Sequence, residues 1–419
     1  MVSPRRTESE RRQGESERPP APPRQSDLAR LLLVGILGCW LLFPFLQIGT
    51  LAEDAIPFIA AGRVVTSQPR DLYSDDDRGG TPALVAAGCP LAPAGSRCDS
   101  SVGPFLAPPQ VLPIMAVIGH LSDAGTVLFM RLAAVLGFAG GMWMVWARLA
   151  ARRRAAQAPL VVAAAVLTPF VYTTVAFGQN APLMFLSVGL GLSQTDRGSR
   201  AAGAAAVWVT TVLFKVFPLP LIAIAVLRRR WKFVAWSAGL LLAMTLVTLT
   251  IAPTSLYGQF LDTSRVVTAN RVASPWNVSV DSLIHSFDPS WRAAGVAFYG
   301  MLALRVGVFG GLYWWKLRDA DDDVQWAYAW VALLALHPQI WWHYLALLVP
   351  AMAYMVASRS ARAAARGRPT MDHRIWWLIP AVAGLTLPLV YVVDTGTLRL
   401  YAPILLLVAA VTMPFVADA

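Results

Sequence analysis

The sequence predicts an all-α polytopic integral membrane protein, and three observations support this fold class. Hydrophobic residues make up 56% of the 419 residues and charged residues only 14%, whereas a soluble globular chain carries roughly 25% charged residues. The mean hydropathy is +0.54. Apolar runs of about 20 residues recur along the chain, and each is long enough to span a bilayer. These features exclude an ordinary cytosolic enzyme, a disordered protein and a nucleic-acid-binding protein.

The first 30 residues differ from the rest of the chain. Residues 1–30 are rich in Arg, Glu, Ser and Pro and lack an apolar stretch, which predicts a disordered tail. The basic flank places this tail in the cytoplasm. The apolar run that follows has no small-residue cleavage site, so we expect a retained first span of a membrane-embedded domain, 31–419. The Ala- and Arg-rich composition is typical of a GC-rich bacterial genome, and therefore of a bacterial plasma membrane protein.

Positive charge between the apolar runs orients the remaining spans. Prolines crowd the segment 105–121, so we expect it to be re-entrant or interfacial and not a regular span. The next run then returns to the Arg cluster at 148–154 on the cytoplasmic side. Lys215, Pro218 and Pro220 interrupt the long run 201–227, which predicts two half-spans that meet at Lys215. The expected spans are 31–49, 124–147, 158–177, 181–194, 201–227 as two halves, 233–251, 293–315, 324–336, 340–357, 374–393 and 398–416.

This topology has about 12 crossings with both termini in the cytoplasm. It leaves two large extracytoplasmic loops, 50–104 and 252–292. Charge alone orients the spans, yet the unusual polar residues all fall at the outer face. They are Asp54, Gln179, Asn180, Lys215, Asn277, Ser279, His337 and His343. Interrupted spans are tolerated where backbone lines a protein cavity, so we expect a cavity that opens outward.

Lys215 is the strongest single indication of function. A Lys inside an apolar segment costs roughly 2.5 to 3.5 kcal/mol on insertion scales. A phosphate at the outer interface would compensate this cost, and the alternative is that the side chain reaches the lipid headgroups without a specific ligand. Specific anion binding is favoured because Pro218 fixes the chain three residues later.

Carboxylates at the end of the first span are candidates for a general base. Glu53 and Asp54 follow the span directly, where a carboxylate can act on a substrate that arrives half in lipid. The alternative is that both residues only cap the helix that continues to Val65.

Histidines and amides complete the set of candidates. His343 begins an inward span and can donate a hydrogen bond to phosphate or transfer a proton. The amides of Gln179 and Asn180 suit sugar hydroxyls or turn backbone, and Asn277 opens a formal glycosylation sequon for which substrate binding or loop structure is the better interpretation. No His or Cys cluster has metal-ligand spacing, and we expect no metal or cofactor.

The order of these segments resembles glycosyltransferase family 87, a bacterial group of GT-C fold membrane enzymes, over about residues 31 to 350. The motifs of the resemblance are Asp54, Ala61-Gly62-Arg63, Asp71-Leu72-Tyr73, Phe105 with Pro108-Pro109, Gly178-Gln179-Asn180, Lys215 with Pro218, Asn277-Val278-Ser279, and His337-Pro338 with Trp341, Trp342 and His343. The family often has an aromatic residue soon after its acidic residue and Gln within the Asn segment, whereas here Ala55 and Val278 occupy these places.

The resemblance implies an inverting glycosyltransferase that uses a polyprenyl-phosphate sugar, mannose or arabinofuranose, and a glycolipid or cell-envelope glycan acceptor at the outer face. In this mechanism Asp54 deprotonates the acceptor hydroxyl, and Lys215 and His343 stabilise the leaving phosphate. Gln179 and Asn180 orient substrates, and Tyr73, Asn277, Ser279 and His337 complete the expected binding site. No nucleotide-binding loop is present.

Two other classes of protein remain as alternatives. A secondary transporter would also have broken helices and an outward cavity, but it commonly shows internal repeats, and none is clear here. A scaffold protein would leave Lys215 unexplained. Cys89 and Cys98 share one outer loop, where a disulfide is compatible with an oxidising compartment.

Overall fold

The computed structural model describes residues 55–65, 67–68, 72–73, 80–91, 102–150, 157–176, 178–195, 200–366, 376–386 and 395–418. Within these ranges the regular structure is helical, and no strand is formed beyond one isolated bridge between Asn277 and Trp341. Five described helices are long and apolar enough to cross a bilayer: Asp123–Leu149, Trp231–Ile251, Gly295–Leu317, Trp342–Ala363 and Leu400–Ala417. The all-α polytopic class is therefore confirmed, and the count of about 12 crossings stays a prediction, as does the first span at 31–49, which lies outside the described residues.

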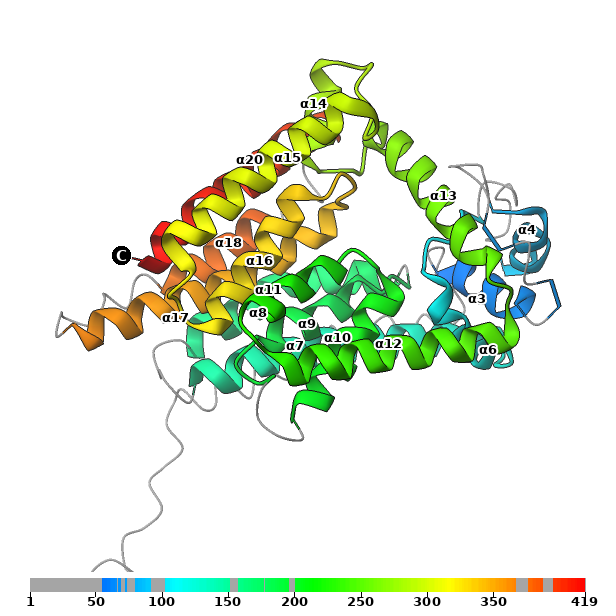
Figure 1. Cartoon of the computed structure of the whole chain (residues 1–419), viewed down its shortest axis with the longest axis horizontal. Helices are drawn as coiled ribbons and strands as arrows, with labels where there is room; N and C mark the ends of the chain where they lie inside the picture. The colour runs from blue at the N-terminus through cyan, green and yellow to red at the C-terminus, as the bar shows by residue number, and fades with distance from the viewer. Residues whose placement is uncertain are drawn as a thin grey trace, which may run out of the picture.

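Three short helices form one end of the molecule, which we call the α3 end. They are α3 (Ile56–Val64), α4 (Pro82–Gly88) and α6 (Leu112–Gly119) (Figure 1). Gly62 lets α3 and α6 cross closely, because a Cβ at this position would lie 2.3 Å from the backbone oxygen of Met115. An ion pair between Arg63 and Asp123 joins α3 to the start of the next long helix, α7 (Asp123–Ala150).

The segment predicted to be re-entrant lies at this end. It contains a helical turn, Pro109–Val111, followed by α6, which has only eight residues. Eight helical residues extend about 12 Å, well short of the roughly 30 Å of the hydrocarbon core. Its expected re-entrant or interfacial position remains a prediction.

The first half of the bundle consists of α7 (Asp123–Ala150), α8 (Gln157–Ala176), α9 (Met184–Leu190), α10 (Arg200–Phe214), α11 (Ile222–Leu227) and α12 (Trp231–Ile251). Glycines again permit close packing, since a Cβ at Gly141 of α7 would lie 2.3 Å from the backbone of Phe185 in α9. The helix breaks where Lys215 predicts a break, because α10 ends at Phe214 and α11 begins at Ile222. Pro218 precedes the short helical turn Leu219–Leu221 that restarts the helix.

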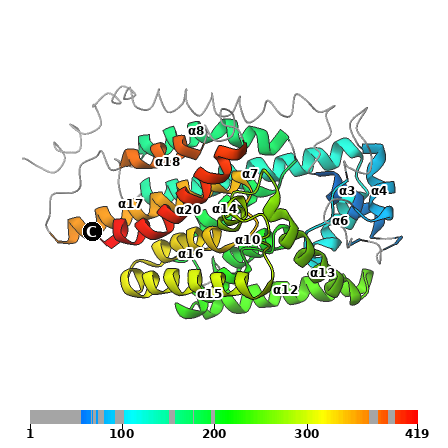
Figure 2. The same ribbon diagram turned by 90° about the horizontal axis from the view of Figure 1, so that it is seen from above.

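The second half begins with α13 (Ser255–Asn270), which runs from the α3 end toward α14 (Val280–Phe287) (Figure 1). It continues with α15 (Gly295–Leu312), α16 (Asp322–Leu336), α17 (Leu348–Ala365), α18 (Leu378–Thr386) and α20 (Thr395–Asp418). Helix α18 lies beside α8 (Figure 2), and α16, α17 and α20 pack against one another.

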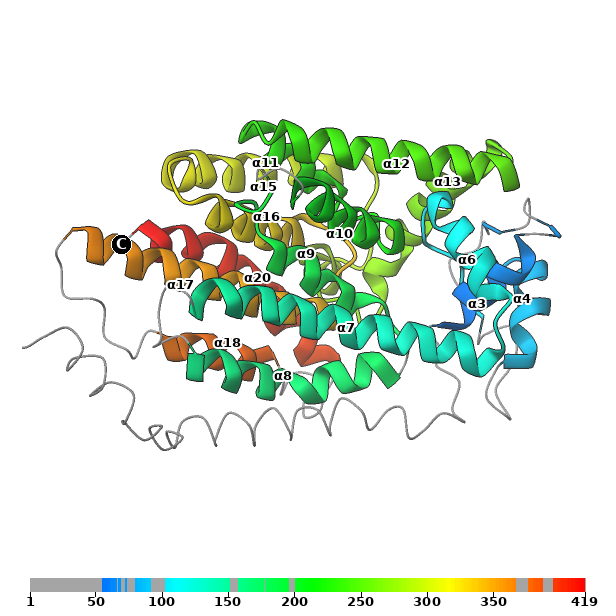
Figure 3. The ribbon, with the colours of Figure 1, turned by 90° about the horizontal axis from the view of Figure 1, so that it is seen from below.

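The outermost spans differ sharply from the central one in burial. Helices α12 and α15 lie on the side of the bundle opposite α8 and α18 (Figure 3). Only 11% and 17% of the residues in their apolar stretches are buried, against 78% for Trp342–Ala363. Exposed apolar surface of this extent is unfavourable in water, so we expect α12 and α15 to face lipid.

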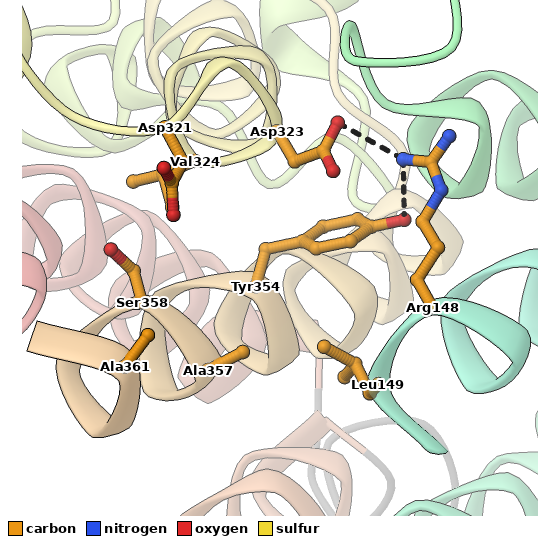
Figure 4. Close-up of a pocket in the computed structure, with 9 residues that line it drawn as sticks. All are labelled: Arg148, Leu149, Asp321, Asp323, Val324, Tyr354, Ala357, Ser358 and Ala361. Carbon is orange, nitrogen blue, oxygen red and sulfur yellow. Dashed lines mark hydrogen bonds and ion pairs between the residues drawn. The ribbon is translucent and has the colours of Figure 1, made fainter. Parts of the chain in front are cut away.

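Arginines and aspartates meet at the end of α16 that is remote from the α3 end. Arg148 lies 3.0 Å from Asp323, whose carboxylate also accepts hydrogen bonds from the backbone and hydroxyl of Ser193. Arg148, Asp323 and Tyr354 line a cavity of about 40 Å³ (Figure 4). Arg228 and Arg230 pair with the neighbouring Asp322.

These ion pairs bear on the topology. Arg148 and the 228–230 cluster come together at one end of the bundle, as the charge-based topology requires. Which end faces the cytoplasm stays a prediction.

Candidate functional site

The helix break after α10 forms the centre of the candidate site. Lys215 is half-buried there, and its backbone N–H still donates to Thr211 at 2.9 Å. Phe217, two residues further on, turns back into the protein and packs edge-on against His337, with ring centroids 5.5 Å apart, and against Tyr344 at 5.1 Å. The interrupted span and the segment after α16 are therefore in direct contact.

Two histidines lie within electrostatic reach of Lys215, whose charge acts on both imidazoles. The side chain of His343 is buried, 4% exposed, and its Nε2 atom has no hydrogen-bond partner among the described residues. A buried polar atom without a partner costs free energy unless a ligand or water satisfies it. The three residues thus form a cationic and hydrogen-bonding cluster, and its role in binding phosphate stays a prediction.

His337 is held by its own turn. Its Nδ1 atom lies 2.8 Å from the backbone oxygen of Gln339 and 3.1 Å from the Gln339 backbone nitrogen. Burial lowers the pKa of His337 to about 4; the contact with Gln339 opposes this shift, and the charge of Lys215 adds to it. His337 is consequently neutral at physiological pH and can donate or accept a hydrogen bond.

The turn before α9 reaches the same break through Asn180. Gly178 adopts a φ of +70°, a conformation that glycine accepts without strain. Asn180 is buried and donates from Nδ2 to the backbone oxygen of Phe214 at 3.4 Å, directly before Lys215. Gln179 is half-buried beside it. The amide of Asn180 therefore supports the break itself.

Asn277 and Ser279 bind the chain rather than face an opening. The Asn277 Nδ2 atom donates to the carbonyls of Arg271 and Pro338, at 3.1 and 3.0 Å, and its Oδ1 atom accepts from the backbone of Ser279 and Ile340, both at 3.0 Å. All four hydrogen-bonding positions of this amide are occupied.

The hydroxyl of Ser279 is also used within the chain. It donates to Pro338 at 2.7 Å and accepts from the backbone of Ser282 at the start of α14. In this conformation Asn277 and Ser279 join two segments of the chain, and the expected direct contact with substrate stays a prediction.

Tyr73 attaches its own segment to the residues before α6 and to α13. Its hydroxyl donates to the backbone oxygen of Ala107 at 2.7 Å, and its ring packs against Phe105 and against Phe260 of α13. Burial raises the pKa of Tyr73 well above its usual value, and the neighbouring Tyr257 adds to this effect. The Leu-Tyr motif and the Phe-and-proline motif are thus packed together, with Tyr73 in a position that supports the loop.

The expected catalytic carboxylate, Asp54, and the neighbouring Glu53 lie outside the described residues. The helix that follows them is described. Ala55 is fully buried, and Phe58 in the first turn of α3 packs against Phe214, with ring centroids 6.2 Å apart. The beginning of α3 therefore lies next to the residue that precedes Lys215.

Sequence reasoning missed a buried ion pair behind the site. Both terminal oxygens of Asp281, in the first turn of α14, accept from the Nη2 atom of Arg305 in α15, at 3.1 and 2.9 Å. Asp281 is fully buried and the side chain of Arg305 is 7% exposed. The signal in the sequence was Arg305 itself, a lone charge within the apolar run 293–315.

Two further expectations concern cysteine and metal chemistry. Cys89 is disulfide-bonded, while Cys39 and Cys98 both lie outside the described residues. Among the residues that the structure describes, no three His, Cys, Asp or Glu side chains are grouped as metal ligands.

The chemical capacity of the site follows from these placements. The break between two apolar helices carries a half-buried ammonium whose charge acts on two imidazoles. One imidazole is neutral, and the other is buried with an Nε2 atom that has no hydrogen-bond partner in the described part of the chain. Such a site can bind an anionic group whose attached chain is apolar.

Comparison with known proteins identifies the family. No curated protein and no solved structure matches the chain. The family model for glycosyltransferase family 87 matches residues 105–338, more than half of the chain. This range contains the turn before α9, the break at Lys215, the Asn277 segment and His337. The chain belongs to glycosyltransferase family 87.

Proposed function

We propose that this glycosyltransferase moves a sugar, mannose, from a polyprenyl-phosphate donor to a lipid-linked or cell-envelope glycan acceptor at the outer face of the plasma membrane. The observation that carries the proposal is the cluster of Lys215, His337 and His343 at an interrupted apolar segment. An anionic donor with a long apolar chain matches this cluster in both charge and hydrophobicity.

The reaction is a single displacement that inverts the anomeric centre. The acceptor oxygen forms a bond to the anomeric carbon while the bond between that carbon and the phosphate oxygen breaks. The hydroxyl proton passes to the carboxylate of Asp54, and the electron pair of the broken bond leaves with the phosphate. Lys215 and the Nε2 atom of His343 stabilise the additional negative charge on that phosphate.

The supporting residues have distinct roles in this proposal. Asn180 fixes the carbonyl before Lys215, and Gln179 orients substrate. Asn277 and Ser279 hold the turn that carries His337, which we propose as their contribution in place of direct substrate contact. Tyr73 fixes the loop that packs on α13.

The test supplies membranes that carry the protein with radiolabelled polyprenyl-phosphate mannose and, separately, with polyprenyl-phosphate arabinose. Label should pass from the mannose donor to a lipid or glycan product. Transfer from the arabinose donor alone would assign an arabinofuranosyltransferase of the same family. Failure of both donors in membranes that contain the acceptor glycans would contradict the proposal.

Asp54→Asn provides the matched test of mechanism. Loss of a general base lowers the rate by about 10² to 10⁴, and the variant should insert and fold normally because one uncharged isostere replaces one carboxylate. The measurement is transfer per folded molecule, with Glu53→Gln as the control. Near wild-type turnover of Asp54→Asn would exclude its role as base.

A further inference from the structure

The buried ion pair between Asp281 and Arg305 joins the first turn of α14 to the sparsely buried helix α15. Asp281 has no exposed surface, and Arg305 lies on one of the least buried spans of the described chain. Exposed positions around Arg305 on the same helix are apolar, such as Leu304 and Val306. Arg305 therefore directs a charged side chain from α15 into the protein. Burial of a charge within a membrane span costs free energy, and residues of this kind commonly have a function.

Arg305 also contacts the segment that leads into the site. Its Nη1 atom donates to the backbone oxygen of Ala335 at 3.4 Å, in the last turn of α16 and two residues before His337. The helix ends at Leu336, so this carbonyl belongs to the group that has no partner further along the helix. Arg305 provides the missing donor.

Helix α14, which carries Asp281 in its first turn, is attached to the same turn from the other side. Its N-cap residue, Ser279, donates from its hydroxyl to the carbonyl of Pro338 at 2.7 Å. Val278, one residue earlier, donates its backbone N–H to Ile340 at 2.6 Å. Residues 338 and 340 are thus bonded to the segment that begins α14, and Ala335, just before this turn, is bonded to Arg305. The ion pair between Asp281 of α14 and Arg305 connects the two sets of contacts.

We propose that Arg305, held by Asp281, is a positioning residue that sets the turn carrying His337 relative to Lys215. The inference rests on the proposed function, because it assigns the pair to the geometry of the phosphate site. Neither residue touches substrate. A displacement of about 1 Å in a reacting group lowers the rate by about 10²-fold, so a pair that fixes this turn acts mainly on kcat.

Single and double replacements of the ion pair distinguish a role in positioning the site from a role in stabilising the fold. Removal of one partner leaves an uncompensated buried charge and destabilises the fold strongly, whereas joint replacement by uncharged residues of similar volume is often neutral. Arg305→Met and Asp281→Asn should each lower the unfolding temperature in detergent. The double variant should recover most of that loss.

The decisive measurement is the transfer activity of the folded double variant with radiolabelled polyprenyl-phosphate mannose. We expect kcat to be about 10 to 100-fold lower, because the Ala335 carbonyl has lost the hydrogen bond from Arg305. The KM for the sugar donor should change less than threefold, because Lys215 remains. Wild-type kcat in this variant would overturn the proposal.

A conservative variant decides the case if the double variant does not fold. Arg305→Lys keeps a positive charge opposite Asp281, but one ammonium cannot reach both that carboxylate and the Ala335 carbonyl in the geometry of a guanidinium. It should fold and lose at least tenfold in kcat. Full activity of Arg305→Lys would equally overturn the proposal.

The chain offers a matched control in the pair formed by Arg148 and Asp323. These side chains are similarly buried, 13% and 10% exposed, and they lie at the remote end of α16. Arg148→Met with Asp323→Asn should show wild-type kcat per folded molecule. Lys215→Met, assayed in parallel, separates the two proposals: wild-type activity in that variant contradicts the phosphate site, whereas low activity there combined with a fully active double variant contradicts only the role of Arg305.

Discussion

Lys215 places an ammonium where the helical backbone is interrupted and where its charge acts on the imidazoles of His337 and His343. The break leaves backbone groups without helical partners, and Asn180 satisfies one of them at Phe214. Insertion of Lys215 into an apolar segment therefore costs free energy, and the polar groups near it can take part in binding an anion. Stability and activity should respond to its replacement in opposite directions.

Lys215→Met tests this balance. The variant keeps the apolar length and removes a charge, so its unfolding temperature in detergent should rise or stay constant. Loss of one charge-assisted hydrogen bond to phosphate, about 1.5 to 3 kcal/mol, should weaken donor use by roughly 10 to 150-fold. Lys215→Arg should be intermediate because the charge survives. A more stable and equally active Lys215→Met would show that the ammonium only reaches the headgroups.

His337 predicts how stability depends on pH. Its pKa is about 4 in the folded protein and about 6.5 in an unfolded chain. Between these values the unfolded state binds more protons, so the free energy of unfolding falls as pH decreases from about 6.5 toward 4. Unfolding temperatures of the wild type and His337→Asn at pH 7 and pH 5 should show a smaller decline in the variant. An equal decline would assign the effect to other groups.

At the scale of elements, the close crossing of α3 and α6 at Gly62 fixes the position of α3. The first turn of α3 packs on Phe214, so its position bears on the geometry around Lys215. No side chain fits at Gly62, where a Cβ would meet the backbone of Met115 and Gly119.

Gly62→Ala should therefore destabilise the protein by about 1 to 3 kcal/mol, the usual cost of overpacking, and lower transfer. The control is Gly203→Ala in α10, where a Cβ meets no atom within 4 Å and where Ala stabilises a helix by about 0.5 to 1 kcal/mol relative to Gly. Thermal unfolding in detergent measures both. A Gly62→Ala protein as stable as the wild type would mean that the two helices separate without cost.

The sequence predicts elements well where the signal is local. Lys215 with Pro218 and Pro220 marks the break between α10 and α11, because charge and missing backbone donors both act at that point in the chain. Gly178 similarly marks the turn before α9. The roles of Asn277 and Ser279 were not predictable in this way, because their partners lie about 60 residues away, beyond the whole of α15 and α16.

Partners of buried charges were also beyond sequence reasoning. Arg305 is conspicuous in an apolar run, yet nothing in the pattern identifies Asp281 as the residue that it meets. The same holds for Arg148, which meets Asp323 although the sequence suggests only a cytoplasmic flank. Such pairs depend on which helices become neighbours, and spans of similar hydropathy are interchangeable in a hydropathy pattern.

At the scale of the whole molecule, the two ends of α16 carry different chemistry. Arg148, Arg228 and Arg230 gather around its first turn, and His337 follows its last turn. Positive residues remain on the cytoplasmic side of bacterial membranes, so the site at the other end should face outward.

Cysteine labelling from the outer side of intact cells tests this orientation. Trp276→Cys replaces a residue that is 51% exposed beside the Asn277 segment and should react with an impermeant reagent. Arg229→Cys, also at an exposed position, should react only after the membrane is opened. Reaction of Arg229→Cys in intact cells would invert the topology or show that segment 105–121 crosses the membrane.

The pairing of Asn277 with Ile340 has a consequence for biogenesis. This contact joins residues 63 positions apart and encloses the whole of α14, α15 and α16. A nascent chain that has inserted α15 already contains Lys215 and Asn180, but it lacks the turn that their cluster needs. Because synthesis proceeds from the N-terminus and closure of such a loop waits for both of its ends, the site is assembled late, when most of the protein is already in the membrane.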